Sequence, residues 1–286
     1  MINQHTILLI GGDQRQLHVI EKLAKSAGQI ILTGFENVQL EYANVCKQHI
    51  SEVDFSSLDS ILLPIPGIGN DGKAESKFSS EDIYLTEDMF RKTKENCCIY
   101  SGIITPFLEY IKKTTGRNIV AIFARDDVAI LNSIPTAEGA LKIAIEETDY
   151  TIHGSHVLVL GFGRVGMTVA RLFSNLGAVV SVAVRESADR ARVQEMGLTP
   201  VLFKHLPDEL DQQNILINTV PFHVLTKQLL DKLSDQTLII DLASRPGGTD
   251  FAYAKEKGIS AIHALGLPAK VAPVTAGEII ADIILE

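Results

Sequence analysis

Short apolar runs and amphipathic stretches alternate along the second half of the chain. The apolar runs predict six strands, at residues 156–160, 178–184, 200–203, 214–220, 237–242 and 259–263. The stretches between them predict helices at residues 164–176, 187–196, 205–211, 223–233 and 249–257. Alternation of this kind is typical of a parallel sheet with crossover helices on both faces. Because six such strands complete a Rossmann unit, we expect a doubly wound α/β domain over residues 133–274.

The first half of the chain carries a pattern of the same type. Apolar runs predict strands at residues 6–10, 29–33, 60–65, 97–100 and 119–123, and a helix at 16–27. The polar, glycine-containing segment 67–80 predicts a surface excursion or a hairpin. We expect a separate flavodoxin-like α/β domain over residues 1–132. The predicted fold class is therefore α/β, with two doubly wound parallel-sheet domains and an interlobe cleft.

Two helices are expected at the border between these domains. Thr136 follows Pro135 and precedes a run of helix-forming residues, which predicts a capped helix start and a helix that spans the hinge. A last helix is predicted at residues 276–285. We expect the segment 275–286 to pack back on the first domain, so that a substrate lies in the cleft between the lobes.

The first strand of the predicted Rossmann domain runs directly into a glycine motif. Gly161 permits a tight turn, Gly163 lets the backbone approach a pyrophosphate, and Gly166 lets the next helix pack closely on the strand. Free N–H groups at the start of that helix favour phosphate. The motif alone is a weak signal, but strand, turn and helix occur here in the required order. We assign to the cofactor site Gly161, Phe162, Gly163, Arg164, Val165 and Gly166.

The end of the second strand of this domain bears on the choice of cofactor. An NAD site needs a carboxylate there for the ribose 2′-hydroxyl, whereas Val184 and Arg185 occupy the position. An arginine can pair with the 2′-phosphate of NADP, and Ser187 and Arg190 add donors. Two alternatives stay open: Glu186 as the ribose acceptor of NAD, and Arg185 as a solvated surface residue. We favour NADP.

The loops after the fourth and fifth strands are expected to face the same cofactor. Ligands of such sheets bind at the carboxyl ends of the strands, near the point where the strand order reverses. These loops add to the expected cofactor contacts Thr219, Val220, Pro221, Asp241, Leu242 and Ala243. In the first domain, the turn Gly11-Gly12 lacks the third glycine of the motif. It is interpreted as a structural turn or as an anion-binding helix N-terminus.

Composition places further limits on function. A net charge of −9 argues against a nucleic-acid or anionic-membrane surface. The sequence has no secretory leader and no apolar run that approaches membrane-spanning length, so we expect a cytoplasmic protein. Cys46, Cys97 and Cys98 form no disulfide framework. We expect reduced thiols, with Cys97 and Cys98 in a buried strand.

Motifs spread over nearly the whole chain carry a family resemblance. They occupy residues 11–13, 15–17, 125–127, 132–139, 148–155, 161–168, 241–251, 266–268, 271–273 and 275–277. The most specific is Asp241-Leu-Ala-Ser-Arg-Pro-Gly-Gly-Thr-Asp-Phe251. In these motifs the chain resembles the family of dipicolinate synthase A subunits from spore-forming bacteria. More distantly, the layout resembles alanine dehydrogenases and adenosylhomocysteinases.

The resemblance implies an activity and its setting. The implied reaction is oxidation of dihydrodipicolinate to dipicolinate, pyridine-2,6-dicarboxylate, with NADP as hydride acceptor. The family also implies a flavoprotein-like partner, the dipicolinate synthase B subunit, and a role in the mother cell during sporulation. We further expect a homo-oligomer.

A substrate with two carboxylates needs at least two clusters of donors, preferably arginines. Arg15, Arg125 and Arg245 lie on predicted loops, although each could instead form a surface or lobe-bridging ion pair. The N-terminus of the last helix, at residues 275–277, offers backbone N–H groups. The expected substrate-binding residues are Arg15, Arg125, Ser133, Thr136, Arg245 and Thr275.

Candidates for a general base are few. Asp126 and His223 are the expected catalytic residues, since His223 follows the loop at 219–221 and Asp126 can couple with Asp127. A helix cap or an ion pair with Arg125 is the alternative for the two aspartates, and a surface position is the alternative for the histidine. The sequence has no metal-ligand or nucleophile-elbow pattern, so we expect no metal.

Two other functions compete with this dehydrogenase. An adenosylhomocysteinase-like enzyme would keep NAD bound, but it predicts an acidic ribose contact, against which Val184 and Arg185 argue. A nucleotide-binding subunit whose partner carries the chemistry would bind the cofactor without turnover. The sequence leaves this second alternative open.

Overall fold

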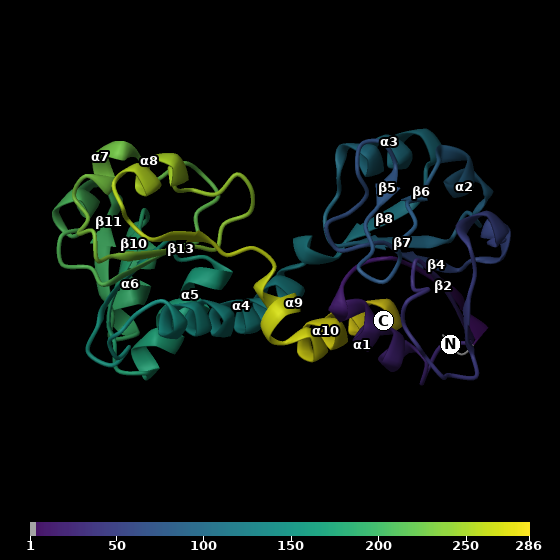
Figure 1. The fold of residues 1–286 in the computed structure, drawn as a ribbon, viewed down its shortest axis with the longest axis horizontal. Coiled ribbons are helices and arrows are strands. Elements are labelled where there is room, and N and C mark those ends of the chain that lie inside the picture. The colour runs from purple at the N-terminus through teal and green to yellow at the C-terminus, as the bar shows by residue number, and fades with distance from the viewer. Residues whose placement is uncertain (1–3) are drawn as a thin grey trace. The chain divides into compact units, whose positions relative to one another are not determined.

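The chain folds into two compact units in the computed structural model, which describes residues 4–286. The first unit holds the described residues up to Ala129 together with Ala272–Glu286, and the second holds Ile130–Val271. Each unit is built on a six-stranded parallel sheet (Figure 1). The predicted fold class, α/β with two parallel-sheet domains, is therefore confirmed.

All six strands predicted for the second half of the chain occur in the structure. They are β9 (His156–Leu160), β10 (Val179–Val184), β11 (Thr199–Leu202), β12 (Ile215–Asn218), β13 (Leu238–Asp241) and β14 (Ala261–His263). Their order is β11-β10-β9-β12-β13-β14, with every pair parallel. The chain connections reverse direction between β9 and β12. The carboxyl ends of these two strands therefore form the switch point at which such sheets bind ligands.

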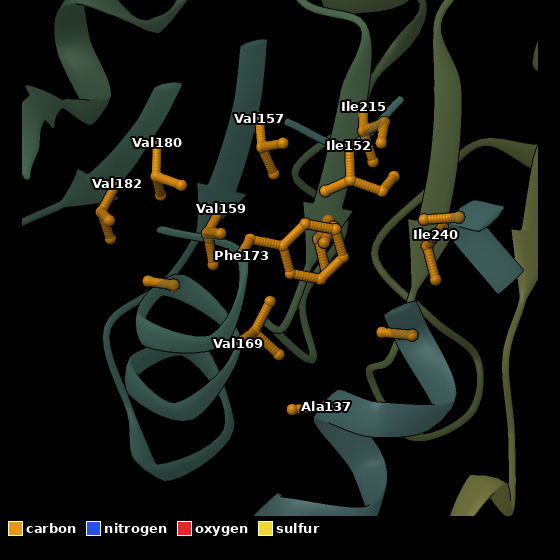
Figure 2. Packing of buried hydrophobic residues seen from close by; sticks show 14 of the residues in the cluster. Ala137, Ile152, Val157, Val159, Val169, Phe173, Val180, Val182, Ile215 and Ile240 are labelled. Carbon is orange, nitrogen blue, oxygen red and sulfur yellow. The ribbon is translucent and has the colours of Figure 1, made fainter. Parts of the chain in front are cut away.

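One face of the second sheet packs against α4 and α5. These helices, and α6 beside them, span Asp126–Glu146, Arg164–Asn175 and Ser187–Glu195. Figure 2 shows Phe173 of α5 in the middle of a buried cluster that contains Val159 of β9 and side chains of β10, β12, β13 and α4. The fully apolar contact fixes α5, and with it the glycine turn that precedes α5, on the sheet.

The opposite face of this sheet is covered by shorter helices. Leu158 and Leu160 point to this face because side chains alternate along a strand. They share a buried cluster with side chains of α7 (Lys227–Leu230) and α8 (Phe251–Glu256). A further short helix, α9 (Leu267–Val271), follows β14. The sheet is thus buried on both faces, as parallel sheets usually are.

The main sheet of the first unit has one strand more than the sequence predicted. Its sheet contains β1 (Thr6–Ile10), β2 (Gln29–Thr33), β3 (Val45–Lys47), β4 (Ser60–Leu62), β7 (Cys98–Ser101) and β8 (Asn118–Ala121). The missed strand is β3, which pairs with β2 at the edge. Without β3, the order would be that of a flavodoxin-like sheet. With it, the order β3-β2-β1-β4-β7-β8 matches that of the second sheet, so the flavodoxin-like expectation is incomplete.

Helices cover both faces of the first sheet. On one face α1 (Gln14–Leu23) and α10 (Pro273–Leu285) lie side by side (Figure 1). Side chains from both helices join Ile7 and Leu9 of β1 in one buried cluster. The other face packs against α2 (Glu87–Lys92) and α3 (Pro106–Thr115). The final segment of the chain is therefore part of the first unit's core.

The predicted excursion between β4 and β7 contains a hairpin. Strands β5 (Lys73–Ala74) and β6 (Ile83–Tyr84) pair antiparallel, which confirms the hairpin alternative. The segment is fixed to the main sheet, because Ser76 forms a bridge with Gly12 and its hydroxyl donates to the carbonyl of Gly34. The hairpin therefore lies at the carboxyl ends of β1 and β2.

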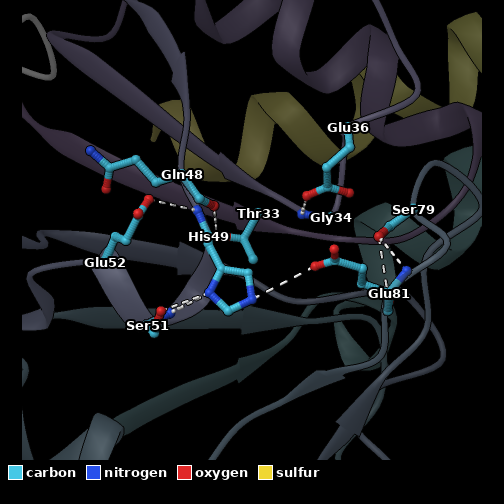
Figure 3. A network of polar contacts seen from close by, with 9 residues as sticks. All are labelled: Thr33, Gly34, Glu36, Gln48, His49, Ser51, Glu52, Ser79 and Glu81. Atoms are coloured by element: carbon cyan, nitrogen blue, oxygen red, sulfur yellow. Dashed lines mark hydrogen bonds and ion pairs between the residues drawn. The ribbon is translucent and has the colours of Figure 1, made fainter.

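Polar contacts join the loop after β3 to this hairpin segment (Figure 3). The ring of His49 lies 2.7 Å from the hydroxyl of Ser51 and 3.7 Å from the carboxylate of Glu81. Thr33 donates its hydroxyl to the carbonyl of Gln48 at 3.0 Å. The bond from Thr33 ties the loop after β3 to β2, and the exposed His49–Glu81 contact places this loop beside the hairpin segment.

Several helix predictions need correction. The helix predicted at 205–211 is a run of 3-10 turns at Phe203–Asp208, where Pro207 disfavours a regular α-helix. The helix predicted at 223–233 is reduced to α7, four residues long. Further 3-10 turns occur at Ile50–Glu52, Phe55–Ser57 and Ile122–Ala124, the last where a strand was expected to continue.

The predicted helix start at Thr136 is wrong. Helix α4 begins ten residues earlier, at Asp126, and Pro135 lies inside it. Proline removes one N–H from the helix and leaves a carbonyl without its partner. Two hydroxyls beside the proline also bond to helix carbonyls: Ser133 donates to Ile130 at 2.6 Å, and Thr136 donates to Asn132 at 2.8 Å. Thr136 is thus an interior helix residue, and the border between the units falls inside α4.

The expectation that no apolar run approaches membrane-spanning length is wrong for α4. By length and composition this 21-residue helix could cross a membrane, and 39% of its most apolar window is buried inside the structure. Ala137, Ala140 and Ala144 lie in the core of the second unit. Part of the apolar surface of α4 is therefore used in packing against the sheet.

Gly277 provides a test of the packing between α10 and α1. A Cβ at this position would lie 2.5 Å from the carbonyl oxygen of Arg15 and 2.8 Å from Cβ of His18. We predict that Gly277→Ala lowers the free energy of unfolding by about 1–3 kcal/mol, because overpacking outweighs the gain in helix propensity. Urea denaturation measures the change, with Glu278→Ala at the exposed neighbouring position as the control. An unchanged unfolding midpoint would contradict this close contact.

Cys97 provides a test of burial beside β7. All three cysteines are free, and Cys97, just before β7, is fully buried. Cys98 begins β7 but is only half-buried, so the prediction that both lie in a buried strand holds in part. Burial is the main cause that raises the pKa of its thiol to about 11. At pH 8 only about 0.1% of this thiol is then ionised, and the thiolate is the reactive form. We predict that iodoacetamide modifies Cys97 only after unfolding in guanidinium, as measured by peptide mass spectrometry. Rapid modification of the folded protein would contradict the burial.

Candidate functional site

The turn between β9 and α5 meets the three demands of a dinucleotide motif. Gly161 has φ of 94°, a backbone conformation that favours glycine. A Cβ on Gly166 would lie 2.2 Å from the carbonyl oxygen of Gly161, so only glycine permits this approach of helix to strand. At Gly163, a Cβ would meet no atom within 4 Å, so the space beside this exposed residue is open.

The start of α5 is suited to an anion. Gly163 is its N-cap, and within the described chain no side chain caps the helix and its first turn holds no acidic residue. The first N–H groups of a helix lack partners within the helix, and its dipole favours negative charge there. The open space at Gly163 together with these donors fits a pyrophosphate. Phe162, Arg164 and Val165 lie in the same turn, Arg164 exposed and the other two half-buried.

Arg185 follows directly on β10, whose last residue Val184 is buried. Its side chain is exposed, and the guanidinium carbon lies 5.5 Å from the ring centre of Phe203, which follows β11. The aromatic face orients the guanidinium through a cation–π contact. Ser187 and Arg190 are exposed in the first turn of α6. Phe203 was not assigned to the site from sequence, although the parallel pairing of β10 with β11 brings these strand ends together.

The alternative ribose acceptor is also exposed. Glu186 is the N-cap residue of α6, but its side chain makes no capping hydrogen bond there. The structure therefore leaves both Arg185 and Glu186 accessible at the end of β10.

The loop after β12 packs directly on the glycine turn. Thr219 donates both its N–H, at 3.0 Å, and its hydroxyl, at 2.8 Å, to the carbonyl of Leu160. A Cβ on Gly161 would lie 2.7 Å from the Thr219 hydroxyl and 2.9 Å from a methyl group of Val220. Thr219 and Val220 thus come together with the glycine motif at the switch point. Pro221, next in the chain, is exposed.

Asp241 has a different role from the one expected. Its carboxylate is completely buried and accepts four hydrogen bonds from protein groups. The donors are Asn218 Nδ2, Ala243 N, Gly248 N and Thr249 Oγ1. With these bonds in place the carboxylate is not available to a cofactor. Leu242 is half-buried and Ala243 is buried in the loop that the carboxylate organises.

Two members of this site, Asn218 and Thr249, were not predicted from the sequence. Asn218 ends β12 and Asp241 ends β13, and the two residues are partners in the parallel register. A polar residue at the end of each of two adjacent apolar strands was the signal that could have identified the pair. Thr249 is eight residues beyond Asp241 in sequence, so no strand pattern pointed to it.

His223 and Arg245 are exposed in the loops after β12 and β13. His223 follows Phe222, whose side chain is 66% exposed and is unusual in that respect. Both loops belong to the second unit, so these residues lie on the same ligand-binding edge as the glycine motif.

Ser133 and Thr136 serve the packing of α4. Ser133 is buried, and its hydroxyl lies 2.6 Å from the hydroxyl of Thr168 on α5 as well as bonding to Ile130. Thr136 is half-buried and bonds within its own helix. The hydroxyls of both residues thus bond to protein groups.

Arg15 is buried at the start of α1, with 6% of its surface exposed. Its guanidinium donates to Asp13 at 2.9 Å and 2.7 Å, and the Asp13 carboxylate also caps the helix. Burial opposes the charge on Asp13, yet the bonds and charge of Arg15 hold the pKa of that carboxyl below its usual value. The N-terminus of α1 thus already holds an anion, which favours the structural interpretation of the Gly11-Gly12 turn.

Arg125 pairs with two carboxylates of the first unit. It lies 2.7 Å from Asp127 and 2.6 Å from Glu286, and these bonds raise its pKa. The bond from Arg125, with one from the N–H of Val128, lowers the pKa of Asp127 to about 2. Asp127 is therefore a weak base near neutral pH. Asp126 is exposed at the first position of α4, in the first unit, whereas His223 belongs to the second.

A cavity of about 430 Å³ lies at the carboxyl ends of β1 and β4 in the first unit. Its lining includes four carboxylates and two lysines: Asp13, Glu75, Glu81, Asp82, Lys73 and Lys77. The surplus of negative charge disfavours a dicarboxylate at this place. Among residues 4–286, no cluster of His, Cys, Asp and Glu is arranged to hold a metal ion.

Thr275 lies in the first turn of α10, which starts at Pro273 and so earlier than predicted. Its side chain is exposed. The next N–H, that of Ala276, donates to the carbonyl of Ala272 at 3.0 Å. Of the residues 275–277 expected to offer backbone N–H groups to a ligand, Ala276 therefore has its N–H engaged within the chain.

Family models match both units of the chain. Residues 6–123 match the N-terminal domain of the dipicolinate synthase A subunit, and residues 136–244 match the NAD binding domain of D-isomer specific 2-hydroxyacid dehydrogenases. The second match agrees with the glycine turn, so the second unit is a nicotinamide-dinucleotide-binding domain of the dehydrogenase type.

Whole-chain comparisons extend these matches. The chain is 46% identical over 284 residues to the dipicolinate synthase A subunit of Bacillus subtilis (strain 168), covering 99% of this chain and 96% of the relative. The crystal structure of the dipicolinate synthase A subunit from Bacillus halodurans matches with a TM-score of 0.96 and 48% identity, over 98% of this chain and 96% of that one. A transhydrogenase from Sinorhizobium meliloti, 15% identical, shares the fold with a TM-score of 0.70, over 98% of this chain and 92% of that one. The chain belongs to the family of dipicolinate synthase A subunits.

Proposed function

We propose that the protein is an NADP-dependent oxidoreductase that oxidises dihydrodipicolinate to dipicolinate. The observation that carries the proposal is the open, uncapped glycine turn at Gly163 in a chain 46% identical to a dipicolinate synthase A subunit. The turn supplies donors for a pyrophosphate, and the family supplies the reaction. The bound nicotinamide would supply the hydride acceptor.

The preference for NADP over NAD rests on the end of β10. Arg185 presents an exposed guanidinium that the ring of Phe203 orients, and Ser187 and Arg190 add donors beside it. An arginine with a planar fork of donors suits a 2′-phosphate better than a free hydroxyl. Glu186, exposed next to it, is the residue that would support NAD instead.

The remaining site residues are proposed for the substrate. We assign to the dicarboxylate Arg15, Arg125, Ser133, Thr136, Arg245 and Thr275, and we assign proton removal to Asp126 or His223. Arg245 fits this role most readily, because it is exposed in a loop at the switch-point edge of the dinucleotide domain. Oxidation creates an aromatic ring, so the product is strongly favoured. Holding the substrate in place is then the main task of these residues.

The setting of the reaction follows from the family. We propose a flavoprotein-like partner, the dipicolinate synthase B subunit, together with a homo-oligomeric state and a cytoplasmic location in the mother cell during sporulation. Neither a membrane nor a nucleic acid is part of the proposed function, which agrees with the net charge of −9.

A cofactor-binding subunit without chemistry of its own is the second candidate. Two of the three arginines assigned to substrate already pair with carboxylates of their own unit: Arg15 with Asp13, and Arg125 with Asp127 and Glu286. A dianionic substrate would have to displace or share those partners. If the substrate does not displace or share these carboxylates, the partner subunit must supply the donors for the substrate.

Turnover by the isolated chain separates the two candidates. We predict that this chain, given NADP and freshly generated dihydrodipicolinate, forms NADPH and dipicolinate at equal rates. NADPH is followed by absorbance and dipicolinate by terbium luminescence. Tight NADP binding with dipicolinate forming only at the protein-free rate would support the cofactor-binding subunit instead.

Arg185 is the test of cofactor preference. We predict that Arg185→Asp weakens NADPH binding by about 3 kcal/mol, or roughly 100-fold, because a charge-assisted pair is replaced by repulsion. NADH binding should change much less, as measured by titration of nucleotide fluorescence. Arg171→Asp, an exposed site of equal charge change on α5, is the control. Equal weakening of both nucleotides by Arg185→Asp would contradict the 2′-phosphate assignment.

A further inference from the structure

A fully buried carboxylate joins the two loops that border the dinucleotide site. Asp241 is 0% exposed, its partner Asn218 is also 0% exposed, and Thr249 is 5% exposed. We infer that Asp241 is a positioning residue: with Asn218 and Thr249 it locks the loops after β12 and β13 into one body that orients the nicotinamide half of the dinucleotide. This inference rests on the proposed cofactor.

Both oxygens of Asp241 are fully used. Oδ1 accepts from Asn218 Nδ2 at 2.9 Å and from Ala243 N at 3.0 Å. Oδ2 accepts from Gly248 N at 2.8 Å and from the Thr249 hydroxyl at 2.7 Å. Burying a carboxylate is costly unless such donors replace water, and here four donors do so. A carboxylate satisfied in this way holds its loop in one conformation.

Asn218 extends the network from Asp241 to the loop after β12. Besides its bond to Asp241, its amide donates to the carbonyl of Val220 at 3.1 Å and accepts from the N–H of Val220 at 3.0 Å. The position of Val220 is thus set by the same side chain that is fixed by Asp241. Val220 in turn lies against Gly161, the first glycine of the motif.

Gly248 closes the contact between the two loops. Its carbonyl accepts from the N–H groups of Val224 and Leu225 at 2.9 Å and 2.8 Å. A Cβ on Gly248 would lie 2.4 Å from Asn218 Nδ2 and 2.7 Å from the carbonyl oxygens of Val220 and Phe222. No larger residue fits here without moving one of the loops. The loops after β12 and β13 are therefore expected to behave as one rigid body.

The network is on one side of the site only. The pyrophosphate and the adenosine of a dinucleotide lie toward the turn after β9 and the end of β10, whereas the loops after β12 and β13 border the nicotinamide half. None of the four bonds of Asp241 involves β10 or α6. Loosening the network should therefore affect the nicotinamide half and spare the adenosine half.

Three substitutions distinguish this role from general stability. Asp241→Asn turns an acceptor into an amide donor, which faces either the N–H of Ala243 or that of Gly248, whichever way the amide is placed. Thr249→Val removes one donor and keeps the shape, while Thr249→Ser keeps the hydroxyl and is the conservative rescue. Asp250→Asn, at the neighbouring N-cap of α8, is the matched control, because asparagine also caps helices.

The test compares a whole dinucleotide with its adenosine half. NADPH binding is followed by fluorescence and 2′,5′-ADP binding by calorimetry, with the melting temperature recorded for each variant. We expect Thr249→Val to weaken NADPH by about 10-fold and 2′,5′-ADP by less than about 2-fold, in line with loss of one hydrogen bond to a buried charge. Asp241→Asn should give a larger difference between the loss of NADPH affinity and the loss of 2′,5′-ADP affinity. Thr249→Ser and Asp250→Asn should bind both ligands with the affinity of the wild type.

Other outcomes overturn the inference in different ways. Equal loss of both ligands in Thr249→Val would show a general effect on the fold, and unchanged binding of both would show that the loops are held without the network. Failure of the wild-type protein to bind either ligand would instead overturn the proposed cofactor itself, and the inference with it.

Discussion

Helix α5 approaches strand β9 so closely that a Cβ on Gly166 would lie 2.2 Å from the carbonyl oxygen of Gly161. This approach fixes where α5 starts and how its N–H groups point at Gly163. It is held by the core, since Phe173 of the same helix packs among strand side chains on the sheet. The loop after β12 then packs on the turn through Thr219, and the loop after β13 follows through Asp241. The candidate site therefore depends on one helix-to-strand contact.

The sheet of the second unit was predictable because local and long-range signals agree there. Each apolar run from 156 to 263 is long enough to mark a strand, and the turn after the first run carries all three glycines. Elements with short or conflicting signals were not predictable. Strand β3 has three residues, two of them Cys46 and Lys47, and it forms only because β2 offers an edge. Pro135 suggested a helix start, but packing of α4 in the core keeps the helix continuous past it.

The candidate site also has a part that the sequence predicts and a part that it does not. Close backbone approaches and left-handed backbone conformations require glycine, so the turn between β9 and α5 could be predicted residue by residue. Side-chain networks leave little trace, because Asn218, Asp241 and Thr249 meet only once the strands are aligned. The arginines of the first unit show that sequence alone does not predict whether a guanidinium is free to bind a substrate. Arg15 and Arg125 are each paired within their own unit. The sequence offered ion pairs as the alternative for these arginines, but it could not choose between a carboxylate of the chain and one of the substrate.

The most direct test of the proposed cofactor site is a crystal structure of the protein grown with NADP. We predict the pyrophosphate against Gly163 and the start of α5, and the 2′-phosphate within hydrogen-bond distance of the Arg185 guanidinium. Density that places the pyrophosphate away from this turn, or that places the adenosine ribose on Glu186 with Arg185 turned to solvent, would contradict the proposed site.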